Sequence, residues 1–189
     1  MKTVIFTYEG APLERVQNVK TLKEQLNAEV FIGGSDTVKN LVELCKRFND
    51  NLLILEDDVE LCNNFKELTT SVISKYNDIV VNFHYNCLPK STDVEKFNGL
   101  KLIRTDGSNY IWNQCFFLPN NVRKLIVDNE KGFRRSYPYY VRTKQQDVYI
   151  AYCIRDSEFI AVYPSLVKHL DFGSTIRDSK SSKTLFTVD

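Results

Sequence analysis

The sequence contains neither of the common glycine-rich phosphate loops. G-x-x-x-x-G-K-[ST] is absent, which argues against a P-loop nucleotide hydrolase, and G-x-G-x-x-G is absent, which removes the usual dinucleotide fingerprint. A G-x-S-x-G nucleophile elbow is also missing, and neither of the two histidines lies in a metalloprotease motif. These absences argue against several familiar classes of enzyme.

Cysteine is present only as five residues that lie far apart, and no two of them form a C-x-x-C pair. The odd number and wide spacing favour reduced thiols in a cytoplasmic protein over a disulfide framework or a zinc site. No apolar run reaches the length of a membrane span, and the N-terminal run is too short for a signal peptide. We therefore expect no transmembrane segment. The net charge is only +1, so binding to nucleic acid would have to come from a local basic patch.

The 189 residues are the size of one ordinary domain, and their 43% hydrophobic and 26% charged content is typical of a globular protein. Strand-like and helix-like segments alternate through the first half, which predicts an α/β domain with a mixed, mostly parallel sheet flanked by helices. The expected strands lie at 3–8, 28–34, 51–56 and 78–83. Helices are expected at 13–27 and from Phe65 to Tyr76. A further helix is expected to begin after a cap at Ser35 or Asp36.

The pattern changes after residue 84. We expect strands near 100–104, at 109–118 (antiparallel) and at 157–163, and helices from Pro119 to about 128 and over 145–154. Residues 131–144 are basic, aromatic and irregular, and we interpret them as a long functional loop. The tail from about residue 173 is expected to order incompletely. No linker divides the chain, so residues 1–189 are predicted to be one domain.

Three consecutive acidic residues, Glu56, Asp57 and Asp58, follow the strand predicted at 51–56. Ligands of open α/β sheets gather at the carboxyl ends of the strands, which is where these acids lie. Alternation along a strand would turn Glu56 and Asp58 to one side, where they could share Mg²⁺ or Mn²⁺, and Asp57 to the other, toward backbone donors. The alternative is an acidic strand end that only caps the next helix.

The stretch ILEDDVEL at 54–61 resembles the DxD-type motif of GT-A fold glycosyltransferases, in particular the lipopolysaccharide-type families with an LEDD motif. QQDVYIAYCI at 145–154 is similar to the acidic acceptor-side motif that opens a helix in that fold. PSLVKHLDFGSTI at 164–176 resembles the segment in which many members place a histidine on the metal. The three motifs occur in the family's order and imply one Rossmann-like GT-A domain. The loop at 8–12 departs from the lipopolysaccharide-type pattern because it lacks an arginine pair.

The resemblance implies a role for each matching residue. Asp58 and His169 would bind Mn²⁺ or Mg²⁺, and Glu56 would contact the metal through water or the donor ribose. Asp147 would be the general base for the attacking hydroxyl. The donor would be a nucleotide-diphosphate sugar, with a UDP-sugar favoured. Its remaining contacts are assigned to residues after the first strand and at the acidic motif, namely Thr7, Tyr8, Glu9, Arg15 and Asp57.

A basic and aromatic stretch precedes Asp147, on the side where an acceptor would enter. Arginine interleaved with tyrosine can bind phosphates while stacking on bases or sugar rings. The residues assigned to acceptor binding are Trp112, Gln114, Arg134, Arg135, Tyr139 and Arg142. The favoured acceptor is DNA with a 5-hydroxymethyl pyrimidine, as for bacteriophage base-modifying glycosyltransferases, which implies base flipping and a location in the host cytoplasm. A saccharide or lipopolysaccharide acceptor fits the same residues.

Each assignment has a structural alternative. Asp147 could only cap a helix, His169 could be an ordinary surface histidine, and the basic stretch could be a solvated loop. For the whole protein, the alternative is a non-catalytic nucleotide- or DNA-binding α/β module. Sugar transfer that depends on Mn²⁺ or Mg²⁺ separates the enzyme from such a module.

Overall fold

The chain is described by a computed structural model that covers residues 1–85, 93–111, 113–139, 145–170 and 172. Its first half comprises β1 (Lys2–Tyr8), α1 (Leu13–Leu26), β2 (Glu29–Gly33), α2 (Thr37–Arg47), β3 (Leu52–Glu56), β4 (Val59–Leu61), α3 (Phe65–Lys75) and β5 (Val80–Asn82). All of these elements except β4 match the sequence prediction. α2 is capped by Asp36, whose side chain accepts a hydrogen bond from the Lys39 N–H at 2.8 Å.

The second half comprises β6 (Val94–Phe97), β7 (Leu100–Asp106), a 3₁₀ turn η1 (Gly107–Asn109), β8 (Cys115–Leu118), α4 (Asn120–Ser136), α6 (Gln146–Ile154), β9 (Glu158–Tyr163) and β10 (Val167–His169). The prediction of a strand over the whole of 109–118 was wrong, because β8 begins only at Cys115. β6 and β10 were not predicted. The tail from residue 173 lies outside the described residues.

The loop predicted at 131–144 was also wrong, because α4 continues to Ser136. The helix persists there because Phe133 is buried against α6. Its ring centroid lies 4.7 Å from that of Tyr149 and 5.3 Å from that of Tyr152. Tertiary packing therefore outweighs the irregular local sequence. Residues 140–144 lie outside the described part of the chain.

The main sheet has the strand order β2-β1-β3-β8-β5-β9-β7-β6, and β4 pairs with β10 in a second, two-stranded sheet. β2, β1 and β3 are parallel, as are β5 and β9, whereas β8 and β7 run antiparallel to their neighbours. Six of the eight strands therefore point in one direction, and β8 and β7 in the other. This mixed sheet confirms the predicted α/β fold class, including the antiparallel strand that ends at residue 118.

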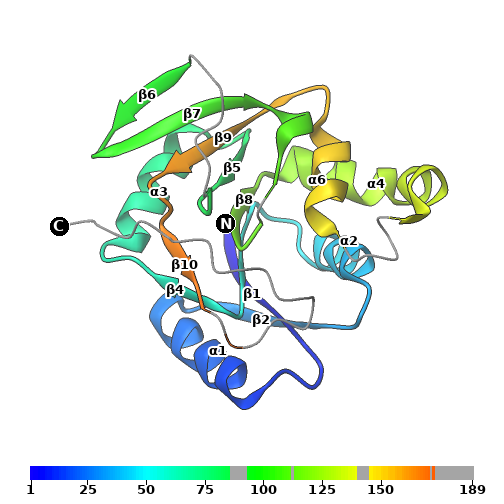
Figure 1. Cartoon of the computed structure of the whole chain (residues 1–189), viewed down its shortest axis with the longest axis horizontal. Coiled ribbons are helices and arrows are strands. Elements are labelled where there is room, and N and C mark those ends of the chain that lie inside the picture. Colours follow the sequence, from blue (N-terminus) through cyan, green and yellow to red (C-terminus); the bar gives the residue numbers. More distant parts are fainter. Residues whose placement is uncertain (86–92, 112, 140–144, 171, 173–189) are drawn as a thin grey trace.

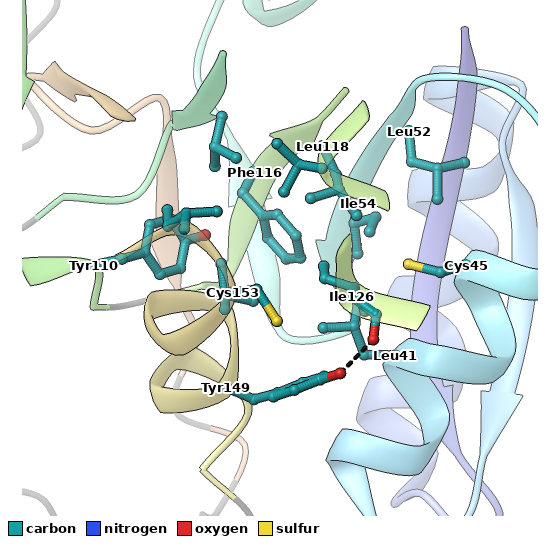
Figure 2. Packing of buried hydrophobic residues seen from close by; sticks show 14 of the residues in the cluster. Leu41, Cys45, Leu52, Ile54, Tyr110, Phe116, Leu118, Ile126, Tyr149 and Cys153 are labelled. Carbon is teal, nitrogen blue, oxygen red and sulfur yellow. Dashed lines mark hydrogen bonds between the residues drawn. The ribbon is translucent and has the colours of Figure 1, made fainter. Parts of the chain in front are cut away.

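Helices cover both faces of the sheet, with α2, α4 and α6 on one side and α1 and α3 on the other (Figure 1). Alternate residues of β3 pack into the two layers. Ile54 belongs to the core under α2, α4 and α6 (Figure 2), whereas Leu53 and Leu55 belong to the core on the other face. By the same alternation, Glu56 lies on the face covered by α6. None of the described helices is both long and apolar enough to cross a bilayer.

Candidate active site

Residues from several strands meet at one edge of the main sheet. β1 and β3 are parallel, with Phe6 opposite Glu56, so the residues that follow both strands lie at the same edge. β8 is antiparallel to β3 and β5, so it begins where those strands end. β10 reaches this edge because it pairs with β4, in which Val59 lies opposite His169. The edge is the carboxyl end of the parallel strands, where α/β folds bind ligands.

Asp57 and Asp58 are both buried, and both form ion pairs with Arg15 of α1. The guanidinium lies 2.6 Å from the Asp57 carboxylate and 2.5 Å from the Asp58 carboxylate. Asp57 also accepts a hydrogen bond from the Thr7 hydroxyl at 2.6 Å. The prediction that Asp57 turns away from Asp58 toward backbone donors was therefore wrong. β3 ends at Glu56, so strand alternation does not continue through the two aspartates.

Glu56 is half-buried at the end of β3, and its N–H donates a hydrogen bond to the Gln114 carbonyl at 2.8 Å. Burial raises the pKa of Glu56 to about 8, and the Asp58 and Asp57 carboxylates add to this shift. Repulsion among the three acids is therefore relieved in two ways. Arg15 offsets part of the charge of the two aspartates, and burial favours the protonated form of Glu56 by raising its pKa.

His169 completes the acidic cluster from β10. Its Nε2 lies 3.2 Å from the Asp58 carboxylate, and this hydrogen bond raises the pKa of His169 above its ordinary value. The Leu170 N–H donates to the Asp58 carbonyl at 2.7 Å, which holds the two segments together. Two predicted metal ligands from distant parts of the sequence are thus neighbours.

The described residues contain no group of three His, Cys, Asp or Glu side chains arranged to hold a metal ion. Asp58 nevertheless keeps one buried carboxylate oxygen that has no hydrogen-bond partner, while its other oxygen faces His169. Mg²⁺ typically binds one or two carboxylates together with substrate phosphates. Asp58 and His169 are therefore the side chains at this edge that could hold such an ion together with a diphosphate.

A cavity of about 330 Å³ lies where β1 ends. It is lined by Thr7, Tyr8, Glu9, Gly10, Ala11, Val16, Val19, Val30 and Ile32. The Tyr8 ring links this cavity to the acidic cluster, because its centroid lies 5.7 Å from the guanidinium carbon of Arg15. A mostly apolar wall with a few polar groups is typical of a small-molecule site. The predicted base-binding residues Thr7, Tyr8 and Glu9 therefore share one cavity.

Asp147 lies in the first turn of α6, where its carboxylate accepts a hydrogen bond from the Val148 N–H at 2.9 Å. Asp147 and Glu56 both act electrostatically on the buried Tyr110 hydroxyl. Burial raises the pKa of the Tyr110 hydroxyl well above its ordinary value, and the Asp147 and Glu56 carboxylates raise it further. Both carboxylates therefore lie within electrostatic reach of one buried hydroxyl.

The structure separates the residues that were assigned to acceptor binding. Trp112 and Arg142 lie outside the described residues. Arg134 forms ion pairs with Asp36 and Glu130, each at 2.9 Å, so it ties α4 to the cap of α2. Arg134 therefore has a structural role, and its predicted contact with an acceptor stays a prediction.

Arg135 and Tyr139 are exposed at the carboxyl end of α4 and just beyond it, and Tyr139 is 62% exposed. Tyr137, between them, is 41% exposed and stacks on Phe133 with the ring centroids 5.5 Å apart. Lys131 is exposed on the same part of α4. These four exposed residues, which we call the α4 patch, are Lys131, Arg135, Tyr137 and Tyr139.

Sequence reasoning missed His84, which follows β5 at the same edge of the sheet. Its buried ring donates a hydrogen bond from Nδ1 to the Gln114 side-chain oxygen. Burial lowers the pKa of His84 to about 4. The charge of His169 lowers this pKa further, whereas the Asp58 carboxylate raises it. The signal that could have found it is its position, because residues just after a parallel strand lie where ligands bind.

Asn18 of α1 was missed as well. Its amide donates to the carbonyls of Asp57 at 2.8 Å and Val59 at 2.9 Å, which fixes the acidic turn against α1. No motif in the sequence marks this contact.

Buried polar atoms without a hydrogen-bond partner concentrate around this edge. Across the described residues they belong to Tyr8, Arg15, Thr37, Asp58, Tyr110 and Asn113. All except Thr37 lie on the segments that form the candidate site. Because buried polar atoms are normally hydrogen-bonded, these atoms are the ones at this edge that remain able to bind a ligand or water.

The sequence matches no protein-family model and no curated protein. Among solved structures, the chain is similar to the crystal structure of A197 from STIV, with a TM-score of 0.52 and 18% sequence identity. The similarity covers 90% of this chain and 86% of A197. At this identity the comparison establishes a shared α/β fold.

Proposed function

We propose that the protein is a metal-dependent glycosyltransferase that moves a sugar from a nucleotide-diphosphate sugar, with a UDP-sugar favoured, to an acceptor hydroxyl. The observation that carries this proposal is the convergence of Glu56, Asp58 and His169 at the carboxyl edge of the sheet, next to the cavity at the end of β1. Acids with an unpartnered carboxylate oxygen suit a cation and a diphosphate. The apolar cavity suits a flat base.

On this proposal, each side of the donor meets residues of suitable chemistry. Thr7, Tyr8 and Glu9 line the cavity for the base, and Arg15 lies between that cavity and the acids, where its guanidinium can reach a diphosphate. Asp58 and His169 would hold Mn²⁺ or Mg²⁺. The bound ion would supply neutralisation of the charge that builds on the departing diphosphate.

Asp147 is the proposed general base. Its carboxylate takes the proton of the acceptor hydroxyl while the hydroxyl oxygen bonds to the anomeric carbon and the sugar–diphosphate bond breaks. A place in the first turn of α6 suits this role, because the positive end of the helix dipole favours the ionised carboxylate.

The favoured acceptor is DNA with a 5-hydroxymethyl pyrimidine, and a saccharide or lipopolysaccharide is the alternative. The α4 patch combines two cationic side chains with two exposed tyrosines, which suits contact with phosphates and stacking on bases. A pyrimidine in a duplex would have to be flipped out for its hydroxyl to reach Asp147.

The catalytic part of the proposal is tested by incubating the protein and Mn²⁺ with UDP-glucose, UDP-galactose or UDP-N-acetylglucosamine and either hydroxymethylated DNA or an oligosaccharide. We expect transfer from one donor, which Asp147→Asn reduces at least about 100-fold while the affinity for UDP stays unchanged. Transfer that survives in Asp147→Asn would show that another group is the base. Binding of UDP without transfer to any acceptor would favour the non-catalytic nucleotide-binding module.

The acceptor is tested by measuring binding to hydroxymethylated DNA as a function of salt. Recognition through several cationic side chains should weaken steeply as the salt concentration rises. The double substitution Lys131→Ala with Arg135→Ala should weaken binding and flatten this dependence. Lys20→Ala with Lys23→Ala, which removes two exposed charges from α1 on the other face of the sheet, is the control and should change little. Equal effects of the two double variants would contradict DNA binding at the α4 patch.

A further inference from the structure

The segment that leads into β8 carries two buried polar groups that have no hydrogen-bond partner within the described part of the chain. Among the described residues, neither the Tyr110 hydroxyl nor the Asn113 side-chain nitrogen has a hydrogen-bond partner. Tyr110 is 1% exposed and Asn113 is 9% exposed, so water does not freely solvate either residue. A buried donor without a partner costs free energy, and such groups are retained where they serve a ligand.

Tyr110 is held rigidly at this position. Its ring packs edge-on against Phe159, with the centroids 5.1 Å apart, and against Phe116 at 6.4 Å (Figure 2). The preceding turn η1 is fixed against the end of α6, because the Gly107 N–H donates to the Ser157 carbonyl at 2.8 Å. The hydroxyl is therefore preorganised, and within the described residues it makes no hydrogen bond that would have to break before it binds a ligand.

The contrast with Tyr149 supports this interpretation. Tyr149 is buried in the same core, and its hydroxyl donates a hydrogen bond to the Ile126 carbonyl, as Figure 2 shows. Within the residues that the structure describes, one buried tyrosine hydroxyl thus has a hydrogen-bond partner and the other has none. The tyrosine without a partner lies four residues before Gln114, whose carbonyl accepts a hydrogen bond from the Glu56 N–H.

Asn113 belongs to the same edge of the sheet. The residue after it, Gln114, accepts a hydrogen bond from the Glu56 N–H through its backbone carbonyl and one from the buried His84 ring through its side chain. These contacts fix the segment beside the acidic cluster. Two neutral donors therefore lie on a segment that is held to Glu56 and His84 through Gln114 at this edge of the sheet.

We propose that Tyr110 and Asn113 form the subsite that binds the hydroxyl groups of the transferred sugar and selects among nucleotide-diphosphate sugars. Neutral hydrogen-bond donors on a buried, preorganised segment suit a polyhydroxyl ring. This inference rests on the proposed function. It assigns specificity for the sugar to this segment, in contrast to the base cavity at the end of β1.

The first test uses the free protein and needs no ligand. Because the Tyr110 hydroxyl has no partner among the described residues, Tyr110→Phe should leave the melting temperature unchanged or raise it. Tyr149→Phe removes a hydroxyl that has a partner and should lower the melting temperature. A fall for Tyr110→Phe as large as that for Tyr149→Phe would show that the Tyr110 hydroxyl is satisfied internally, and would overturn the subsite.

The second test measures the affinity for UDP and for the three UDP-sugars by calorimetry in Mn²⁺. Tyr110→Phe and Asn113→Ala should each lower the affinity for the best-bound UDP-sugar by about 5- to 10-fold and leave the affinity for UDP unchanged. Tyr149→Phe should change neither affinity. Unchanged UDP-sugar binding in both site variants overturns the subsite alone. No UDP binding by the unaltered protein overturns the proposed function, and with it the assignment to a sugar.

Discussion

Arg15 is the cation that makes the acidic turn compatible with burial. Its side chain is 11% exposed and contacts two carboxylates that are almost fully buried. Removing one partner of a buried ion pair leaves uncompensated charge, which is more costly than losing a surface pair. The sequence predicted three acids at a strand end, but it gave no sign that an arginine from α1 would reach both aspartates, because the pairing depends on how α1 lies over the sheet.

Arg15→Gln should therefore lower the free energy of unfolding by about 3–5 kcal/mol, as measured by urea denaturation. This loss of stability should be smaller when Mn²⁺ is added, because a bound cation can replace the lost positive charge. The control is Lys23→Gln, which removes an exposed cation from the same helix and should cost less than about 0.5 kcal/mol. Equal stabilities of the two variants would show that the aspartates do not need Arg15.

His84 predicts how stability depends on pH. Burial lowers its pKa to about 4 in the folded protein, against about 6.5 in the unfolded chain. Below about pH 6.5 the unfolded chain takes up a proton that the folded protein does not, so stability falls until the pH reaches about 4. Between about pH 7 and pH 4.5, the free energy of unfolding of His84→Gln should therefore fall by about 2–3 kcal/mol less than that of the unaltered protein. Parallel losses in urea denaturation at the two pH values would show that His84 is protonated in the fold.

At the scale of the elements, sequence patterns predicted helices and strands correctly where a segment determines its own conformation. The helical spacing at 13–27 and the buried-type run at 51–56 became α1 and β3. They failed where the partner is distant in sequence. β4 and β10 are three-residue strands that exist because they pair with each other, and α4 extends past its predicted end because Phe133 packs on α6. Neither partner is visible in a local window.

The contact between η1 and α6 is a packing contact between elements, and a substitution at Gly107 tests it. A Cβ atom on Gly107 would overlap the carbonyl oxygen of Ile154, whereas a Cβ on Gly34 would meet nothing within 4 Å. Gly107→Ala should therefore lower the free energy of unfolding by about 1–3 kcal/mol, because backbone must move to relieve the overlap. Gly34→Ala is the matched control and should change it by less than about 0.5 kcal/mol. Equal thermal stabilities would mean that η1 and α6 are not in close contact.

At the scale of the whole molecule, the sheet explains which parts of the candidate site were predictable. Parallel strands end at one edge, so Glu56, Asp58 and the residues after β1 could be placed together from the sequence. The motif order brought in His169, which the β4–β10 pairing sets beside Asp58. Tyr110 could not be placed, because the rings that it packs against, Phe116 and Phe159, come from β8 and β9, and only the folded chain brings them together.

The central claim is that this edge binds a nucleotide diphosphate together with a divalent cation. Titration calorimetry of UDP, with Mn²⁺ and with EDTA, tests it most directly when the unaltered protein is compared with Asp58→Asn. The account predicts binding that requires Mn²⁺ and that Asp58→Asn weakens at least about 10-fold, which is about 1.4 kcal/mol, while the circular dichroism spectrum is unchanged. UDP binding of the same strength in EDTA, or in Asp58→Asn, would contradict it.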